Sequence, residues 1–129
     1  MGLENGIRIK DFAQNSLIEK FFRSPFGYRV DNEIEICYWR RCRNIRSMIL
    51  NILHEPINTC NYEFVLTRKD IIRIKKGLKL FLNKSCAWRD SAWEFYEIEE
   101  SLKRDVRNLR ILSFLMKFKN FNVYFYDSY

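Results

Sequence analysis

Glycine and proline are scarce in this sequence, whose 129 residues include four Gly and two Pro. An average protein contains roughly 7% Gly and 5% Pro. A barrel or sandwich of many short strands needs turn residues at regular intervals, so this composition disfavours both and favours a few long elements. The glycines, at positions 2, 6, 27 and 77, are too scattered to form a phosphate-binding loop. We therefore do not expect nucleotide-dependent catalysis.

Candidate catalytic and metal-binding residues are also few. The only histidine is His54, and no local pattern places a serine or cysteine nucleophile beside it, so we interpret it as a surface or helix-end residue. The four cysteines are separated by 5, 18 and 26 residues, which matches no zinc-binding spacing. We predict reduced thiols, no metal, no cofactor and no enzymatic activity.

The chain lacks a long hydrophobic run. Its longest uncharged stretch covers residues 47–54, which is far shorter than a membrane span, and charged residues interrupt the opening segment. We therefore expect a cytoplasmic protein without a membrane segment. Hydrophobic residues make up 47% of the chain and aromatic residues 16%, enough to bury a core, and no linker or repeat divides it. Residues 1–129 are expected to form one domain.

Hydrophobic spacing predicts the main elements. Apolar residues recur at helical intervals over about 11–23, 32–54, 67–83 and 93–118. Thr67 and Asp70 resemble a capping box at the start of the third of these helices. Alternating residues predict strands over 62–66 and 123–126, which we expect to pair, and Ile7 and Ile9 are consistent with a further short strand. The predicted fold class is α+β: three or four helices dominate and pack on a two- or three-stranded sheet.

The formal net charge is +7 and is unevenly distributed along the chain. On a helix over 32–54, arginines recur every third residue opposite the apolar stripe, beside a tryptophan. Tryptophan and arginine are the side chains that most often anchor protein interfaces, and an exposed indole can also stack on a base. The contact surface that we predict from this helix comprises Trp39, Arg40, Arg43, Arg46 and Leu50.

A second predicted surface lies on the helix over 67–83. Its predicted contact residues are Lys69, Arg73, Lys76 and Lys79. A further basic row, Lys103, Arg107 and Arg110, lies on the last helix. In the C-terminal half of this helix some apolar residues point away from the main apolar stripe and predict burial on more than one side, namely Phe114, Ile111, Leu115 and Phe118. If the two basic rows converge in space, the chain could neutralise nucleic-acid phosphates.

An acidic run precedes the last basic row. On a helix, Asp90, Glu94 and Glu97 would share one face. Three interpretations stay open: favourable placement of acids at a helix N-terminus, a protein-binding acidic surface, or a site for a divalent cation or acid–base chemistry.

Three segments of the chain have a general resemblance to a known group of proteins. They are YWRRCRNIRSMILNIL, LTRKDI and NVYFYDSY. Together with the abundance of Lys, Ile, Asn, Phe and Tyr, they resemble small proteins of phages and mobile elements from AT-rich bacteria. The resemblance implies a non-enzymatic protein that binds a host factor, in its sharpest form an anti-CRISPR-like inhibitor of a defence nuclease. It transfers no functional residue.

These observations favour a small binding protein that occupies a surface of a larger, nucleic-acid-handling protein partner. The alternative is a sequence-independent DNA- or RNA-binding protein that uses the same basic helix faces. The salt dependence of nucleic-acid binding separates the two.

Overall fold

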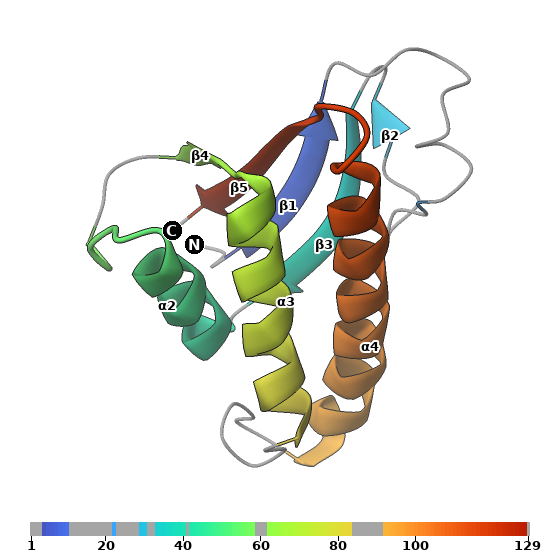
Figure 1. Cartoon of the computed structure of the whole chain (residues 1–129). Coiled ribbons are helices and arrows are strands. Elements are labelled where there is room, and N and C mark those ends of the chain that lie inside the picture. The colour runs from blue at the N-terminus through green and yellow to red at the C-terminus, as the bar shows by residue number, and fades with distance from the viewer. Residues whose placement is uncertain are drawn as a thin grey trace.

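The structure is a computed structural model that describes residues 4–10, 22, 29–30, 33–40, 42–58, 62–83 and 92–128 (Figure 1). Along the chain, the first three described elements are strands, and helices and strands are interspersed after them. In order the described elements are β1 (Glu4–Lys10), β2 (Arg29–Val30), β3 (Glu33–Arg40), α2 (Arg43–Ile52), β4 (Glu63–Val65), α3 (Arg68–Asn83), α4 (Ala92–Leu115) and β5 (Asn122–Ser128).

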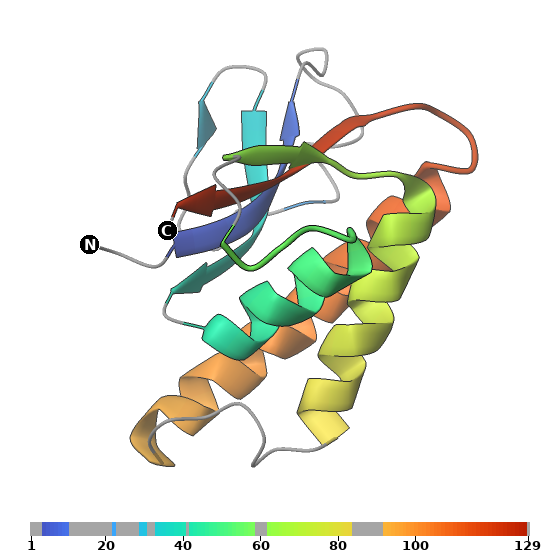
Figure 2. The same ribbon diagram turned by 90° about the vertical axis from the view of Figure 1, so that its left-hand side faces the viewer.

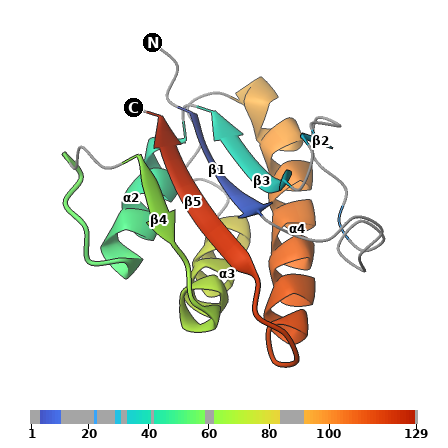
Figure 3. The same ribbon diagram turned by 90° about the horizontal axis from the view of Figure 1, so that it is seen from above.

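The strands form one antiparallel sheet with the order β2-β3-β1-β5-β4, in which β2 has only two residues. The first long strand lies at the centre, because β1 pairs with β3 on one side and with β5 on the other. Glu4 pairs with Ser128, so the two ends of the described chain lie side by side (Figure 3). The predicted pairing of the 62–66 strand with the last strand is confirmed, with Phe64 opposite Phe125.

Helices α2, α3 and α4 lie on one face of this sheet and bury it, which gives two layers (Figure 2). Alternation along β1 sends Ile7 and Ile9 into the layer between sheet and helices, where both are fully buried. From the helices, Ile49, Leu78 and Leu109 enter the same core. Burial of this apolar stripe on each helix is what holds the two layers together.

The two predicted C-terminal helices are confirmed as α3 and α4, with ends that differ from prediction by no more than three residues. The capping box at α3 is also confirmed: Thr67 N donates to Asp70 Oδ2 over 2.9 Å, and Asp70 N donates to Thr67 Oγ1 over 3.3 Å. Arg68 Nε donates to the Ser113 carbonyl oxygen over 2.9 Å, so the start of α3 lies beside the end of α4.

The predicted helix over 32–54 is wrong in its first half, because residues 33–40 form β3 and only 43–52 are helical. A β-bulge explains the error. Ile7 pairs with Cys37 and Arg8 with Glu35, which leaves Ile36 as an extra residue on β3. The alternation therefore skips once, and the buried apolar residues fall at 34, 36, 37 and 39. With this interruption, the spacing of apolar residues on β3 continues into the helical spacing of α2, and the two together resemble the apolar stripe of one long helix.

Helix α2 ends in a Schellman motif, in which Glu55 N donates to Leu50 O over 2.9 Å and His54 N to Asn51 O over 3.1 Å. His54 takes the left-handed position that usually holds glycine, with φ 59°. The expectation that His54 lies at a helix end is therefore confirmed.

The α+β class is confirmed, but its proportions differ from the prediction. The sheet has more strands than the two or three expected, and the helices do not clearly dominate. The predicted helix over 11–23 lies outside the described residues except for Phe22, which is buried. No helix among the described residues combines the length and apolar character needed to cross a membrane.

Candidate functional site

The first predicted contact surface is largely wrong, because Trp39 points into the protein. Its indole is only 3% exposed, and Nε1 donates to Asp105 Oδ2 of α4 over 2.9 Å. Burial raises the pKa of the Asp105 carboxyl to about 7, although the Trp39 N–H opposes the rise. The indole therefore links β3 to α4 inside the core and is not available to a partner.

Arg46 and Leu50 are interior residues as well. Leu50 is fully buried, and the Arg46 side chain is 3% exposed. Arg46 Nε and Nη2 each lie 2.9 Å from a carboxylate oxygen of Asp127 on β5, and Nη2 donates to the Ile57 carbonyl over 2.7 Å. A buried guanidinium needs such partners, and Asp127 supplies them from the far end of the sequence. Of the five predicted residues on this surface, Arg40 and Arg43 are exposed.

The second predicted surface lies on the outside of the molecule. Lys69, Arg73, Lys76 and Lys79 are all exposed along α3. Ile71, Ile74 and Leu78 occupy the buried side of the same helix, as the apolar stripe predicts. Within the described part of the chain, none of the four basic side chains forms an ion pair or side-chain hydrogen bond. Their charges are therefore available to an anionic ligand.

The two basic rows converge where α3 packs along α4. Lys75 of α3 is half-buried, and α3 packs against α4. Burial lowers the pKa of the Lys75 ammonium, and the positive charges of Lys79 on its own helix and Arg110 on α4 lower it further. Lys76 and Arg68 act in the same direction. Lys79 of one basic row and Arg110 of the other thus both act on Lys75, so the two rows approach each other at this point.

We call this surface the basic helix face. It comprises Lys69, Arg73, Lys75, Lys76 and Lys79 of α3 and Arg107 and Arg110 of α4. The positive charges of Lys79, Arg110 and Lys76 repel that of Lys75, so an anion bound beside these residues lowers the energy of the arrangement. Phosphate groups of a nucleic acid, or clustered carboxylates of a protein, have the required charge.

Two aromatic rings extend the basic helix face, and the sequence did not lead us to expect them there. Phe114 and Phe118 are 56% and 76% exposed, so the expected burial on more than one side is wrong for both. It holds for Ile111 and Leu115, which are partly buried against the core. The ring centroids of the two phenylalanines lie 5.4 Å apart in an edge-to-face arrangement. The available signal was spacing: Phe114 follows Arg110 by four residues and therefore shares its face of α4.

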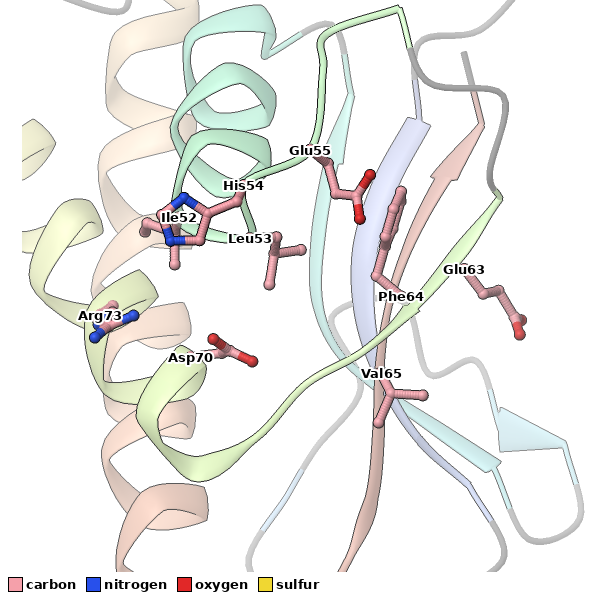
Figure 4. Close-up of a pocket in the computed structure, with 9 residues that line it drawn as sticks. All are labelled: Ile52, Leu53, His54, Glu55, Glu63, Phe64, Val65, Asp70 and Arg73. Carbon is pink, nitrogen blue, oxygen red and sulfur yellow. The ribbon is translucent and has the colours of Figure 1, made fainter.

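The only histidine lies at a pocket of about 410 Å³ between the end of α2, β4 and the start of α3 (Figure 4). Asp70 and Arg73 line the side formed by α3. Asp70 is engaged in the α3 capping box, and no serine or cysteine is among the lining residues. Among the residues that line this pocket, no serine or cysteine nucleophile therefore accompanies His54.

A polar cluster occupies the sheet face opposite the described helices. The Tyr126 hydroxyl donates to Glu35 Oε1, and the Arg8 guanidinium lies 4.1 Å from the centre of the Tyr126 ring. Burial raises the pKa of the Glu35 carboxyl, while the Tyr126 hydroxyl and Arg8 act in the opposite direction. Gly6 makes room for the cluster, since a Cβ there would lie 2.5 Å from the Tyr126 ring. These groups come from β1, β3 and β5 and contact one another across the three neighbouring strands.

Among the residues described, no group of three or more His, Cys, Asp or Glu side chains is placed to hold a metal ion. Cys37 and Cys42 are free thiols, whereas Cys60, Cys86 and Asp90 lie outside the described residues. Glu94 and Glu97 fall within α4. Comparisons with protein-family models, curated proteins and solved structures found no match for this chain.

Proposed function

We propose that this chain is a cytoplasmic, non-enzymatic nucleic-acid-binding protein that uses the basic helix face without reading base sequence. The packing of α3 along α4 supports the proposal, because it brings basic residues of two helices to one side of the molecule: Arg68 of α3 donates to the Ser113 carbonyl of α4, and Arg110 of α4 is near enough to Lys75 of α3 to act on its charge. A single row of basic residues on one helix is common on solvent-exposed faces and does not by itself indicate a ligand. Two rows that meet create a positive field across both helices, which suits a polyanion.

The absence of sequence reading follows from the type of side chains. Lysine is a flexible point charge that contacts phosphate oxygens well, and phosphate contacts fix position without identifying bases. Lysines outnumber arginines on the α3 part of the basic helix face. We therefore expect similar affinities for unrelated sequences of the same length.

The test compares two double charge reversals that lower the net charge equally. Lys76→Glu with Lys79→Glu alters the basic helix face, and Arg40→Glu with Arg43→Glu alters the remains of the first predicted surface. All four side chains are exposed, so the fold should survive both changes. Fluorescence anisotropy with labelled oligonucleotides should show at least tenfold weaker binding for the α3 variant and near-normal binding for the control. Equal losses in both would mean that binding follows net charge, which overturns the proposal.

A protein partner is a second proposal, and it rests on a different surface. Ile57, Tyr62 and Val65 are 60%, 51% and 69% exposed around β4, the edge strand of the sheet. A groove of about 580 Å³ adjoins Ile57. Exposed apolar residues at a sheet edge are typical of places where another chain pairs. A phage-type inhibitor of a nucleic-acid-handling enzyme, such as a CRISPR nuclease, would bind its target in this way.

The second proposal has its own measurement. Val65→Lys removes apolar surface at the edge without touching the buried Phe64 beside it. Pull-down from the native host followed by mass spectrometry should recover a partner with the wild-type protein and lose it with the variant. A partner retained by Val65→Lys but lost on reversal of Lys76 and Lys79 would assign protein binding to the basic helix face instead.

A further inference from the structure

The exposed pair Phe114 and Phe118 is unusual for its position. Phe114 lies in the last turn of α4, and Phe118 lies in the turn that follows this helix before β5. The turn that follows α4 is held by hydrogen bonds from Lys117 N to Phe114 O, 3.2 Å, and from Phe118 N to Leu115 O, 3.0 Å. The pair is thus presented by ordered backbone and not by an open loop. No packing contact of the core requires a phenylalanine at a position that is 76% exposed.

Positive charge surrounds the two rings. Arg110 lies one helical turn before Phe114, and Lys117 Nζ lies 5.9 Å from the centre of the Phe114 ring. Lys119 follows Phe118 in the sequence and is also exposed. An aromatic surface bordered by cations offers two kinds of contact at once: a π face for a flat ring and ammonium groups for phosphates.

A single strand can use both kinds of contact, but an intact duplex can use only one. In a duplex the base faces are stacked on their neighbours, so a phenylalanine on a helix surface reaches only sugar and phosphate. In a single strand the bases are free to unstack and lie on aromatic rings while the backbone follows the basic residues. This difference decides the class of nucleic acid that fits the surface.

We propose that Phe114 and Phe118 form a stacking platform at the end of the basic helix face, and that the preferred ligand is single-stranded nucleic acid. The inference rests on the proposed function and adds to it the class of nucleic acid. Phosphates of the strand lie along Lys75, Lys79 and Arg110, and the next bases along the strand stack on the two rings. Because every base has a π face, the platform adds affinity without adding sequence preference.

The experiment measures affinity for a labelled oligo-dT of about 15 nucleotides, near the upper end of the lengths that one binding fold covers, and for a hairpin duplex of matched charge. The variants are Phe114→Ala with Phe118→Ala, Lys76→Glu with Lys79→Glu, and Leu80→Ala as the matched control. Leu80 is 58% exposed on α3, so its removal deletes exposed apolar area without deleting an aromatic ring. Circular dichroism melts confirm that each variant is folded.

We expect the wild-type protein to bind oligo-dT more tightly than the hairpin. The double phenylalanine variant should lose about tenfold or more on oligo-dT, the change that corresponds to at least one stacked base, and little on the hairpin. The lysine variant should weaken binding to both, and Leu80→Ala should change neither. Wild-type preference for the hairpin, or unchanged oligo-dT binding by the phenylalanine variant, overturns the platform but leaves the proposed function standing. Absence of binding to both probes overturns the proposed function itself.

Discussion

The buried ion pair between Arg46 and Asp127 gives the sharpest stability prediction. It connects α2 to β5 across the core edge, with side chains 3% and 1% exposed. Arg46→Met keeps most of the side-chain volume and removes the cation. Asp127 then keeps, of the side-chain partners described for it, only the amide of Asn5. Breaking a buried pair by removing one partner costs about 3–5 kcal/mol, a large part of the roughly 5–15 kcal/mol that stabilises a typical domain.

Urea denaturation followed by circular dichroism measures this loss. With a slope of about 1–3 kcal/mol per molar urea, the midpoint should fall by roughly 2 M. Adding Asp127→Asn to Arg46→Met removes the stranded charge, so the double variant should be more stable than Arg46→Met alone. Arg43→Met, an exposed position on the same helix, is the control and should change stability by less than about 0.5 kcal/mol. A loss below about 1 kcal/mol for Arg46→Met would refute the reasoning.

Three further predictions concern single positions. Gly6→Ala should lose about 1–3 kcal/mol by overpacking, because its Cβ would lie 2.5 Å from the Cys37 carbonyl oxygen; a smaller loss for Gly77→Ala, where the Cβ meets a flexible methionine, is the matched comparison in urea melts. His54→Gly should raise the thermal midpoint by relieving the left-handed φ of 59°, a gain of about 1 kcal/mol, and a lower midpoint would contradict this. The pKa of the Asp105 carboxyl is raised from its usual value of 3.8 to about 7 in the folded protein, so between these two pH values this carboxyl holds a proton in the folded state and not in the unfolded state. The free energy of unfolding should therefore fall between about pH 4 and 7 by up to ~1.4 kcal/mol per unit relative to Asp105→Asn, and parallel pH profiles for the two proteins would exclude the assigned proton.

Much of the C-terminal half could be predicted because its signals are local. The spacing of Leu102, Leu109 and Leu112 fixes the buried side of α4, and the Thr67 and Asp70 capping box fixes where α3 begins. The alternation along β4 predicted that Phe64 lies on one side of the strand and Glu63 and Val65 on the other, and Phe64 is buried whereas both neighbours are exposed. These patterns depend only on residues within a turn or a strand of one another.

The burial of the residues on the first predicted contact surface could not be predicted, because it depends on partners that are distant in the sequence. Arg46 is buried only because Asp127 lies against it from 81 positions later, and Trp39 is buried because Asp105 accepts its N–H from another element. The bulge at Ile36 also depends on residues distant in the sequence. It is defined by the pairing of β3 with β1, and Asn108 of α4 donates to the Ile36 carbonyl over 2.9 Å. Hydrophobic periodicity contains no information on such pairings, so an interior arginine and indole resemble a binding surface when only the sequence is known.

The sequence shows the two basic rows but does not show whether they approach each other in the folded protein. Each row is visible in the sequence, but whether Arg110 meets Lys75 depends on how α3 and α4 cross. Their antiparallel packing, set by the buried leucines and by Arg68 on the Ser113 carbonyl, brings the rows together. The candidate site is therefore a tertiary property of two helices that are individually ordinary.

The most direct test of the proposed function is the salt dependence of binding. If about five of the seven cations on the basic helix face contact phosphates of a single strand, log K should fall with log salt concentration with a slope near −3.5. Affinity would then drop by about two decades between 50 and 200 mM salt. Lys76→Glu with Lys79→Glu should make that slope shallower by about 1.4, and Arg40→Glu with Arg43→Glu should leave it unchanged. A slope near zero for the wild-type protein, or one that the α3 variant does not alter, would contradict phosphate binding by the basic helix face.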